Sequence, residues 1–177
     1  MLGLNVETAS PDIDESAVEA DSPSHLAEKL AKIKAEKVYR DLHPEGCPVV
    51  AADTLVEIGG KILGKPRSVA EAGEMLRMLS GKLHYVHTGL AVIYSGTFAS
   101  AVETATVHFR ELSDDEIESY IMSGEPMDKA GAYGIQGRAG AFVDRIEGDF
   151  FSIVGLPLCR LVTLLRNTMG LTLSDMK

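Results

Sequence analysis

Val49–Leu55, which reads V-V-A-A-D-T-L, is the stretch that decides the fold of this chain. Its small and apolar residues predict a buried strand, which an acid, Asp53, interrupts. A buried carboxylate is unfavourable unless another group pairs with it or uses it. One interpretation is therefore a turn or capping aspartate. The other is that Asp53 ends the strand and faces a cleft beside Lys65, which a Gly59-Gly60 hairpin would bring back to it.

The combination of an acid and a lysine in one cleft indicates chemistry on phosphates. A carboxylate can accept a proton or hold a metal ion, and a lysine can bind phosphate, so the pair suits phosphate-ester hydrolysis. Three further carboxylates lie close together at Asp12, Asp14 and Glu15. They exceed what an ordinary loop needs for solubility, although a solvated acidic loop remains the alternative.

The length and charge of the chain limit the classes of function. Its 177 residues suit one domain with a sizeable core. Lysine and arginine number 17 against 26 acidic residues, and the formal net charge of −9 argues against binding a nucleic acid polymer through its phosphate backbone. A free nucleotide remains compatible, because a local cluster of lysines can outweigh the net charge within one pocket.

The cysteines and the apolar runs predict a cytoplasmic protein with no membrane partner. Cys47 and Cys159 are far apart and fit no metal-ligand spacing, which favours reduced thiols and leaves a disulfide as the open alternative. No apolar run has the length of a membrane span. The N-terminus also lacks the basic-then-apolar layout of a secretion signal.

Four helices are predicted from capping residues and apolar periodicity. Ser22-Pro23 starts the first helix, which runs to about Val38. Two capping boxes, Ser68–Glu71 and Ser113–Glu116, open helices to about Met78 and Met122. An amphipathic helix from Leu156 to about Met169 closes the chain.

The predicted strands are rich in β-branched and aromatic residues. Residues 83–94 and 98–109 form a long antiparallel hairpin that turns at Ser95-Gly96. Two short strands follow, at Phe142–Arg145 and Phe150–Val154, after a glycine-rich loop over Lys129–Gly140 that can approach a ligand closely. Strands that alternate with helices around such a hairpin predict an α/β domain with a mixed sheet.

Two motifs match a known nucleotide-binding or metal-binding pattern only in part and are rejected. Gly59 and Gly64-Lys65 match a Walker A loop until Pro66, which offers neither the hydroxyl nor the amide that this loop needs. His84 and His87 are three residues apart on a predicted strand, so they face opposite sides of the sheet and cannot chelate one metal ion.

Seven ordered motifs along the chain resemble those of the Maf family, the septum-formation-like nucleoside triphosphate pyrophosphatases. The resemblance is carried by Asp12–Glu15, Ala31–Ala35 around Lys34, Ala51–Thr54, Gly64–Pro66, His84-x-Val86-x-Thr88-Gly89, Lys129–Gly137 and Val154–Leu158. Each motif alone is weak, but their order makes the set specific.

The resemblance implies a fold, a reaction and an assembly. The fold is α/β with a mixed, strongly curved central sheet, flanking helices and two lobes around a cleft, as in inosine triphosphate pyrophosphatases. The reaction is hydrolysis of the α–β phosphate bond of a nucleoside triphosphate to the monophosphate and pyrophosphate. The wording of Gly131–Gln136 is similar to the subfamily that acts on dTTP and UTP. The family also implies a frequent homodimer.

The resemblance further assigns roles by motif position. Asp53 matches the proton acceptor, and Glu15 together with Asp53 would hold a divalent metal, Mg²⁺ or Mn²⁺. The substrate-binding residues comprise three that match contacts to the triphosphate and two that match positions linked to base choice. These are Lys34, Lys65 and Lys129, and Thr54 and Gln136.

The chain departs from the family at its N-terminus. Family members begin with a strand and a turn that reads roughly L-A-S-x-S-P-R-R, so the resemblance implies that residues 1–177 form one Maf-like domain that is shortened by about twenty residues at its N-terminus. Arginines in that turn give bidentate phosphate contacts that lysine does not replace. The alternative is therefore a non-catalytic nucleotide-binding or cell-division-associated module.

Overall fold

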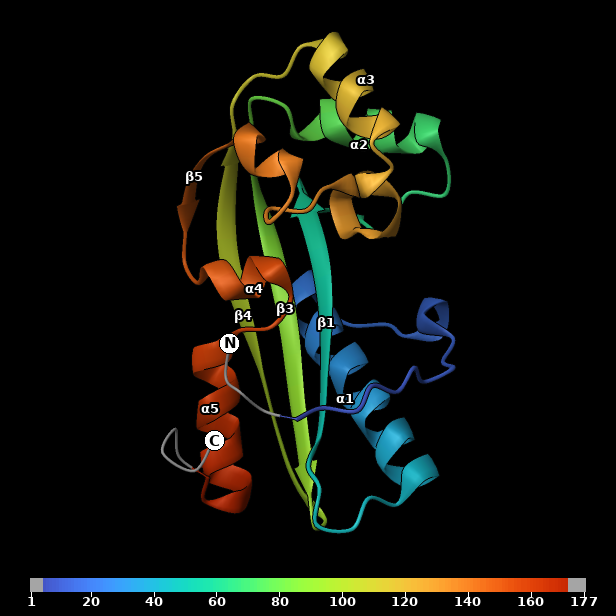
Figure 1. Ribbon diagram of the computed structural model, residues 1–177, viewed down its shortest axis with the longest axis vertical. Helices are drawn as coiled ribbons and strands as arrows, with labels where there is room; N and C mark the ends of the chain where they lie inside the picture. The colour runs from blue at the N-terminus through green and yellow to red at the C-terminus, as the bar shows by residue number, and fades with distance from the viewer. Residues whose placement is uncertain (1–4, 172–177) are drawn as a thin grey trace.

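A five-stranded sheet in the order β2-β1-β3-β4-β5 lies at the centre of the computed structural model, which describes residues 5–171 (Figure 1). The strands are β1 (Val49–Ile58), β2 (Lys61–Leu63), β3 (Leu83–Tyr94), β4 (Thr97–Phe109) and β5 (Val143–Glu147). Every strand pairing within residues 5–171 is antiparallel. The α/β class is confirmed. The mixed, strongly curved sheet is wrong, because all of these pairings are antiparallel and the sheet does not curl strongly (Figure 1).

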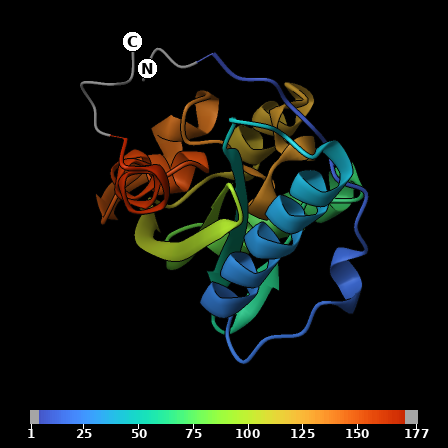
Figure 2. The ribbon, with the colours of Figure 1, turned by 90° about the horizontal axis from the view of Figure 1, so that it is seen from below.

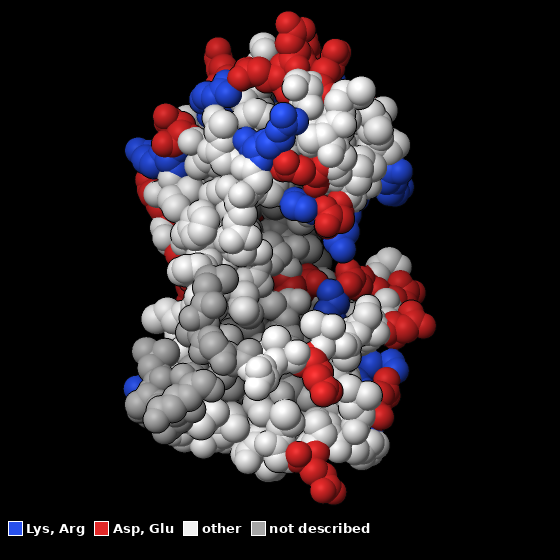
Figure 3. Space-filling view, in the orientation of Figure 1, with Lys and Arg blue, Asp and Glu red and all other residues white. Residues whose placement is uncertain are grey.

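Helices cover both faces of this sheet. They are α1 (Pro23–Leu42), α2 (Val69–Leu79), α3 (Asp114–Met122), α4 (Phe150–Val154) and α5 (Leu158–Met169). The described residues also form four 3₁₀ helices, η1 (Glu15–Ala17), which precedes α1, and η2 (Glu125–Asp128), η3 (Ala130–Ala132) and η4 (Arg138–Phe142), which lie between α3 and β5. Helices α1 and α5 lie on opposite faces of one half of the sheet (Figure 2), while α2 and α3 lie over its other end. Midway between these ends the surface is hollowed (Figure 3).

Helix α1 lies very close to strand β3. Three alanines, Ala27, Ala31 and Ala35, are fully buried on the face of α1 that meets the sheet. Opposite them stands Gly89, where a Cβ would lie 2.2 Å from the carbonyl oxygen of Ala27. Only glycine allows this approach, because any side chain would collide with the helix backbone. The contact brings Lys34, on the same helix, next to strand β1.

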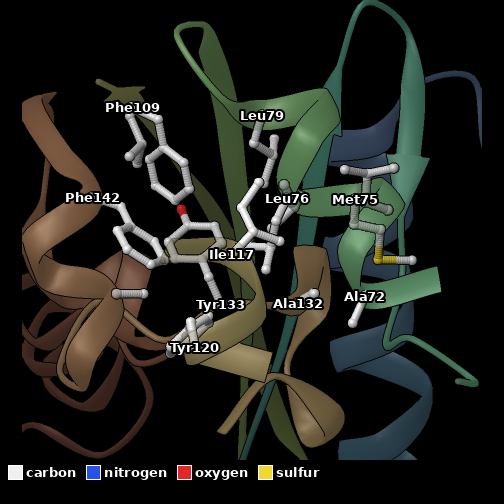
Figure 4. Close-up of a cluster of buried hydrophobic side chains, with 14 of the residues drawn as sticks. Ala72, Met75, Leu76, Leu79, Phe109, Ile117, Tyr120, Ala132, Tyr133 and Phe142 are labelled. Atoms are coloured by element: carbon white, nitrogen blue, oxygen red, sulfur yellow. The ribbon is translucent and has the colours of Figure 1, made fainter. Parts of the chain in front are cut away.

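The main hydrophobic core lies between the sheet and the α2–α3 end of the molecule (Figure 4). The rings of Phe109 and Tyr133 meet edge to face with centroids 4.8 Å apart, and Phe142 lies 6.0 Å from Phe109. Such edge-to-face contacts add to the free energy gained by burying the rings. Through Tyr133 and the fully buried Ala132, this core holds the glycine-rich loop in place.

The segment Phe150–Val154, predicted as a strand, is helix α4. The prediction is wrong because the flanking residues specify helix ends. The carboxylate of Asp149 accepts the backbone N–H of Phe151 at 2.9 Å and caps the first turn. Gly155, with φ of +109°, ends the helix in the left-handed region that glycine adopts readily. The preceding predicted strand is confirmed as β5.

One of the two predicted capping boxes is complete. Ser113 and Glu116 satisfy each other's backbone N–H groups at the start of α3. At the start of α2, Ser68 accepts the N–H of Glu71, but the Glu71 carboxylate accepts the N–H of Arg67 at 2.7 Å. The predicted box of Ser68 and Glu71 is thus only half formed. The guanidinium of Arg67 also donates to the Glu71 carboxylate and holds it there.

The two histidines of β3 occupy opposite faces, as predicted. His84 Nε2 lies 2.9 Å from the hydroxyl of Tyr133 within the main core. His87 instead contacts Thr104 at 2.9 Å and Glu57 at 3.1 Å on the other face.

Two further observations concern the thiols and the helices. Cys47 and Cys159 are free and exposed, which agrees with the reduced-thiol interpretation. Within residues 5–171, no helix combines the length and the apolar character that crossing a bilayer requires.

Candidate active site

A cavity of about 460 Å³ lies beside strand β1, between helix α1, the glycine-rich loop and helix α4. Acidic and basic side chains border the hollow that marks this part of the surface (Figure 3). All predicted site residues except Glu15 line the cavity. They are Lys34, Asp53, Thr54, Lys65, Lys129 and Gln136. Six of the seven predicted site residues therefore lie around one shared space.

Asp53 lies in the middle of β1, opposite Gly89 of β3. Both the turn interpretation and the strand-end interpretation are wrong, because β1 continues to Ile58. The Asp53 side chain is only 10% exposed, and it accepts a hydrogen bond from the ammonium group of Lys34. The same ammonium lies 2.7 Å from Glu15. One lysine thus joins the two carboxylates predicted to act together.

The surroundings of Asp53 shift its proton affinity. Burial raises the pKa of Asp53 above its ordinary value of 3.8, and the negative charge of Glu15 adds to that rise. The positive charges of Lys34 and Lys65 oppose the rise without cancelling it. Burial also acts to lower the pKa of Lys34, but the bonds to Asp53 and Glu15 outweigh burial and raise it. Lys34 therefore stays charged, and Asp53 holds a proton more readily than an exposed aspartate does.

Glu15 reaches the site from the 3₁₀ helix η1. The first turn of η1 is capped by Asp14, whose carboxylate accepts the N–H of Ser16 at 3.1 Å. This capping accounts for one acid of the acidic cluster and leaves the side chain of Glu15, 53% exposed, directed to Lys34. The cluster is therefore partly a structural cap and partly an extension of the site.

The donor set at Lys34 fits a divalent cation in part. Carboxylate oxygens are the ligands that Mg²⁺ prefers, and Glu15 and Asp53 both reach one positively charged group. Within residues 5–171, no group of three or more histidine, cysteine, aspartate or glutamate side chains could hold a metal ion. The two carboxylates thus suit an ion that takes its other ligands from water and phosphate oxygens, as Mg²⁺ commonly does.

Two more lysines line the cavity from the strand β2 side and from the loop. Lys129 forms an ion pair with Asp128 at 2.6 Å, and both residues line the cavity. Lys65 has no carboxylate within ion-pair distance in the described part of the chain, and its neighbour Gly64 accepts the N–H of Gly131 at 3.1 Å. Lys65 therefore offers its positive charge directly to a ligand.

The loop that carries Gln136 is held at several points. The hydroxyl of Tyr120 accepts the N–H of Gly134 at 3.2 Å, and the carboxylate of Glu125 accepts the N–H of Arg138 at 3.0 Å. Gly131 adopts a φ of +67°, and a Cβ there would lie 3.0 Å from the Val56 side chain. The loop is thus fixed on both sides of Gln136, which faces the cavity with one donor and one acceptor group.

Some lining residues were missed by the sequence analysis. Ile153 and Val154 form a wall on α4, a segment that was predicted as a strand. Asp128 was missed as well, although its place directly before Lys129 is a usable signal. Tyr133 lines the cavity while its hydroxyl contacts His84, whose pKa burial lowers to about 4. His84 is therefore uncharged near neutral pH.

Comparisons with known proteins give a consistent result. A family profile described as Maf-like protein matches residues 1–168. A dTTP/UTP pyrophosphatase of Symbiobacterium thermophilum is 48% identical over 164 residues, which cover 93% of this chain and 84% of that protein. One of Alkaliphilus oremlandii is 48% identical over 174 residues, covering 97% and 90%. One of Thermotoga maritima is 46% identical over 158 residues, covering 89% and 76%.

Proposed function

Because the chain belongs to the Maf family, we propose that it is a nucleotide pyrophosphatase that hydrolyses the α–β phosphate bond of dTTP and UTP. The products are the nucleoside monophosphate and pyrophosphate. The observation that carries the proposal is the shared cavity of Asp53, Lys34, Lys65 and Gln136. It joins a proton acceptor, two phosphate-binding cations and a side chain that can contact a base.

Asp53 acts as the general base in this proposal. Its carboxylate takes a proton from the attacking water while pyrophosphate leaves from the α phosphorus. A carboxylate whose pKa is raised accepts a proton more readily, and Asp53 has this property because it is buried. Lys34 keeps the carboxylate oriented through their hydrogen bond. Asp53 is thus both more basic and held in place.

The charge of the triphosphate needs compensation inside this cavity. Lys65 and Lys129 line the cavity and supply positive charge, whereas Asp53 and Asp128 repel an anion. Glu15 and Asp53 would hold Mg²⁺ or Mn²⁺, because both carboxylates contact the same ammonium group, that of Lys34, and therefore lie near each other. When bound, such an ion neutralises phosphate charge and polarises a phosphoryl oxygen.

Gln136 and Thr54 select the base in this proposal. A glutamine side chain has one carbonyl acceptor and two N–H donors, and uracil and thymine present adjacent acceptor and donor groups on one edge. The support is the position of Gln136 on a loop fixed by Tyr120 and Glu125. A fixed loop costs little conformational entropy when the base binds.

Several finer features stay predictions from the resemblance and the composition. They include two lobes around the cleft as in inosine triphosphate pyrophosphatases, a single Maf-like domain, a homodimer and a cytoplasmic location. The hollow between the two ends of the sheet supports the two-lobed description (Figure 3).

Product analysis tests the proposed reaction. UTP and dTTP are incubated with the protein and Mg²⁺ or Mn²⁺, and nucleotides are separated by chromatography while pyrophosphate and phosphate are measured. We expect one pyrophosphate for each monophosphate formed. Release of phosphate with UDP would place cleavage at another bond, and binding of UTP without any hydrolysis would favour the non-catalytic module.

A further inference from the structure

Three polar groups form a hydrogen-bonded chain that leads from the cavity into the protein. Thr54 and Thr88 are direct partners across β1 and β3, and their hydroxyl oxygens lie 2.8 Å apart. The Thr88 hydroxyl lies 2.7 Å from the backbone carbonyl oxygen of Ser152, on α4. Thr54 lines the cavity, whereas Thr88 is fully buried behind it.

The number of hydrogens on each group decides which hydroxyl donates and which accepts in these hydrogen bonds. A carbonyl oxygen has no hydrogen, so Thr88 must donate its single hydroxyl hydrogen to Ser152. The Thr88 oxygen can then only accept in its contact with Thr54. Thr54 therefore donates its own hydrogen to Thr88, and its hydroxyl has only lone pairs left for a ligand in the cavity.

We infer that Thr88 is a positioning residue that makes Thr54 an acceptor-only group, so that this point of the cavity recognises a hydrogen-bond donor on the nucleotide. The inference rests on the proposed function for the identity of the ligand. In a uridine or thymidine nucleotide the donor is the N3–H of the base or the hydroxyl of the sugar. A ligand with a lone pair at the same place meets the lone pairs of Thr54 and is rejected.

The surroundings of Thr54 strengthen this selection. A Cβ on Gly155 would lie 3.3 Å from the Thr54 hydroxyl oxygen, so the backbone approaches it closely. The apolar side chains of Ile153 and Val154 line the same wall. In such a partly apolar place, an unsatisfied lone pair costs more than it does in water.

Binding constants measured by calorimetry, in the presence of Mg²⁺, test the inference. The probe is α,β-methylene-UTP, which cannot be hydrolysed at the bond in question. Two analogues each remove one donor: the cytidine counterpart has a lone pair in place of N3–H and an amino group in place of the C4 carbonyl, and the 3′-O-methyl counterpart lacks the hydrogen of the 3′-hydroxyl. The proteins are the wild type and the variants Thr88→Val, Thr88→Ser and Thr54→Val.

The wild type is expected to bind the probe more tightly than one of the analogues, so the ratio of the analogue's Kd to the probe's Kd is above one. In Thr88→Val this ratio is expected to fall about 5- to 30-fold, the factor of one ordinary hydrogen bond. Thr88→Ser retains the hydroxyl and should keep the wild-type preference. Thr54→Val removes the acceptor and should narrow the same preference, which keeps the test decisive if Thr88→Val does not fold. The analogue affected identifies the base or the sugar as the donor.

A different result is expected if Thr88 has only a structural role. Thr88→Val would then weaken the binding of all three nucleotides by one common factor and leave the ratio of their Kd values unchanged, which overturns the inference. Failure of the wild type to bind α,β-methylene-UTP overturns it as well. Binding with the expected preference but without pyrophosphate release from UTP would support the inference and refute only the proposed reaction.

Discussion

Asp53 shows how burial and charge act in opposite directions on one residue. Burial raises its pKa, and Lys34 limits the rise by supplying a positive charge to the ionised form. The ionised carboxylate is the form that accepts a proton, so activity should fall as the pH drops through the pKa of Asp53. This acid limb should therefore lie above pH 3.8, the ordinary pKa value.

Replacing the lysine tests this assignment. In Lys34→Met the pKa of Asp53 loses its main opposing charge and rises further, so the acid limb of kcat/KM should move to higher pH. Lys37→Met is the matched control, because Lys37 lies on the same helix and pairs with the exposed Asp41. If the acid limb of Lys34→Met stays at the wild-type pH, Lys34 does not control the pKa of the catalytic carboxylate.

The same pKa shift predicts the pH dependence of stability. The folded protein holds the proton of Asp53 more tightly than the unfolded chain, so this contribution to stability is present at low pH and is lost as the pH rises through the folded pKa. Asparagine does not titrate, so Asp53→Asn does not lose stability in this way. As the pH rises from low to neutral, its free energy of unfolding, measured in urea, should increase relative to that of the wild type.

Asp41→Asn provides a control of opposite sign. The hydrogen bond from Lys37 lowers the pKa of Asp41, so the wild type gains stability from this carboxylate above its ordinary pKa and loses it as the pH falls. Over the same rise in pH, the free energy of unfolding of Asp41→Asn should therefore decrease relative to that of the wild type. Equal pH trends in both variants would contradict the electrostatic account.

Gln136 should control the choice of substrate more than the rate. In Gln136→Ala the cavity loses the amide that is proposed to contact the base, while Asp53 and the lysines remain. We expect the ratio of kcat/KM for UTP to that for ATP to fall about tenfold, the value of one to two hydrogen bonds. The maximum rate with UTP should change less. An unchanged ratio would remove Gln136 from base selection.

At the scale of the elements, the contact between α1 and β3 connects the fold to the site. A methyl group at Gly89 would collide with the backbone of Ala27, so Gly89→Ala should shift α1 and move Lys34 away from Asp53. We expect a loss of about 1–3 kcal/mol in the free energy of unfolding. Activity should fall further than stability explains.

Gly64→Ala is the matched control for stability, because a Cβ at Gly64 meets no atom within 4 Å. Urea unfolding measures both variants. A Gly89→Ala protein with wild-type stability and activity would show that the close approach of α1 is unnecessary.

Element prediction from the sequence succeeded where caps and periodicity agree. Ser22 and Pro23 begin α1 as predicted, and Ser113 and Glu116 begin α3 with a complete capping box. It failed at Phe150–Val154, because a five-residue helix is too short to show a helical period. The apolar and aromatic residues of that segment suit a strand, and only the residues that flank it, Asp149 and Gly155, indicate a helix.

At the scale of the molecule, the site could be predicted more fully than the sheet. The Maf-like motifs identified the cavity residues, and these residues lie on elements far apart in the sequence. Strand direction depends on how helices return the chain, which local patterns do not encode, so the mixed sheet was wrong. The hydrogen bonds that link Thr54, Thr88 and Ser152 could not be predicted from the sequence either, because they depend on which strands pair.

An acidic protein can bind an anion when its positive charges lie close together at the binding site. The net charge of −9 opposes a triphosphate at a distance. Within the cavity, Lys34, Lys65 and Lys129 act at short range and face Asp53 and Asp128. Salt screens the distant charges more than the partly buried ones, so binding should depend only weakly on ionic strength.

The central claim is that Asp53 activates water for attack on a pyrimidine nucleoside triphosphate. The most direct measurement is pyrophosphate release from UTP and dTTP by the wild type, Asp53→Asn and the exposed control Asp41→Asn at neutral pH. We expect Asp53→Asn to lose about 10²- to 10⁴-fold in kcat while it stays folded, and Asp41→Asn to keep full activity. Wild-type turnover by Asp53→Asn would contradict the account.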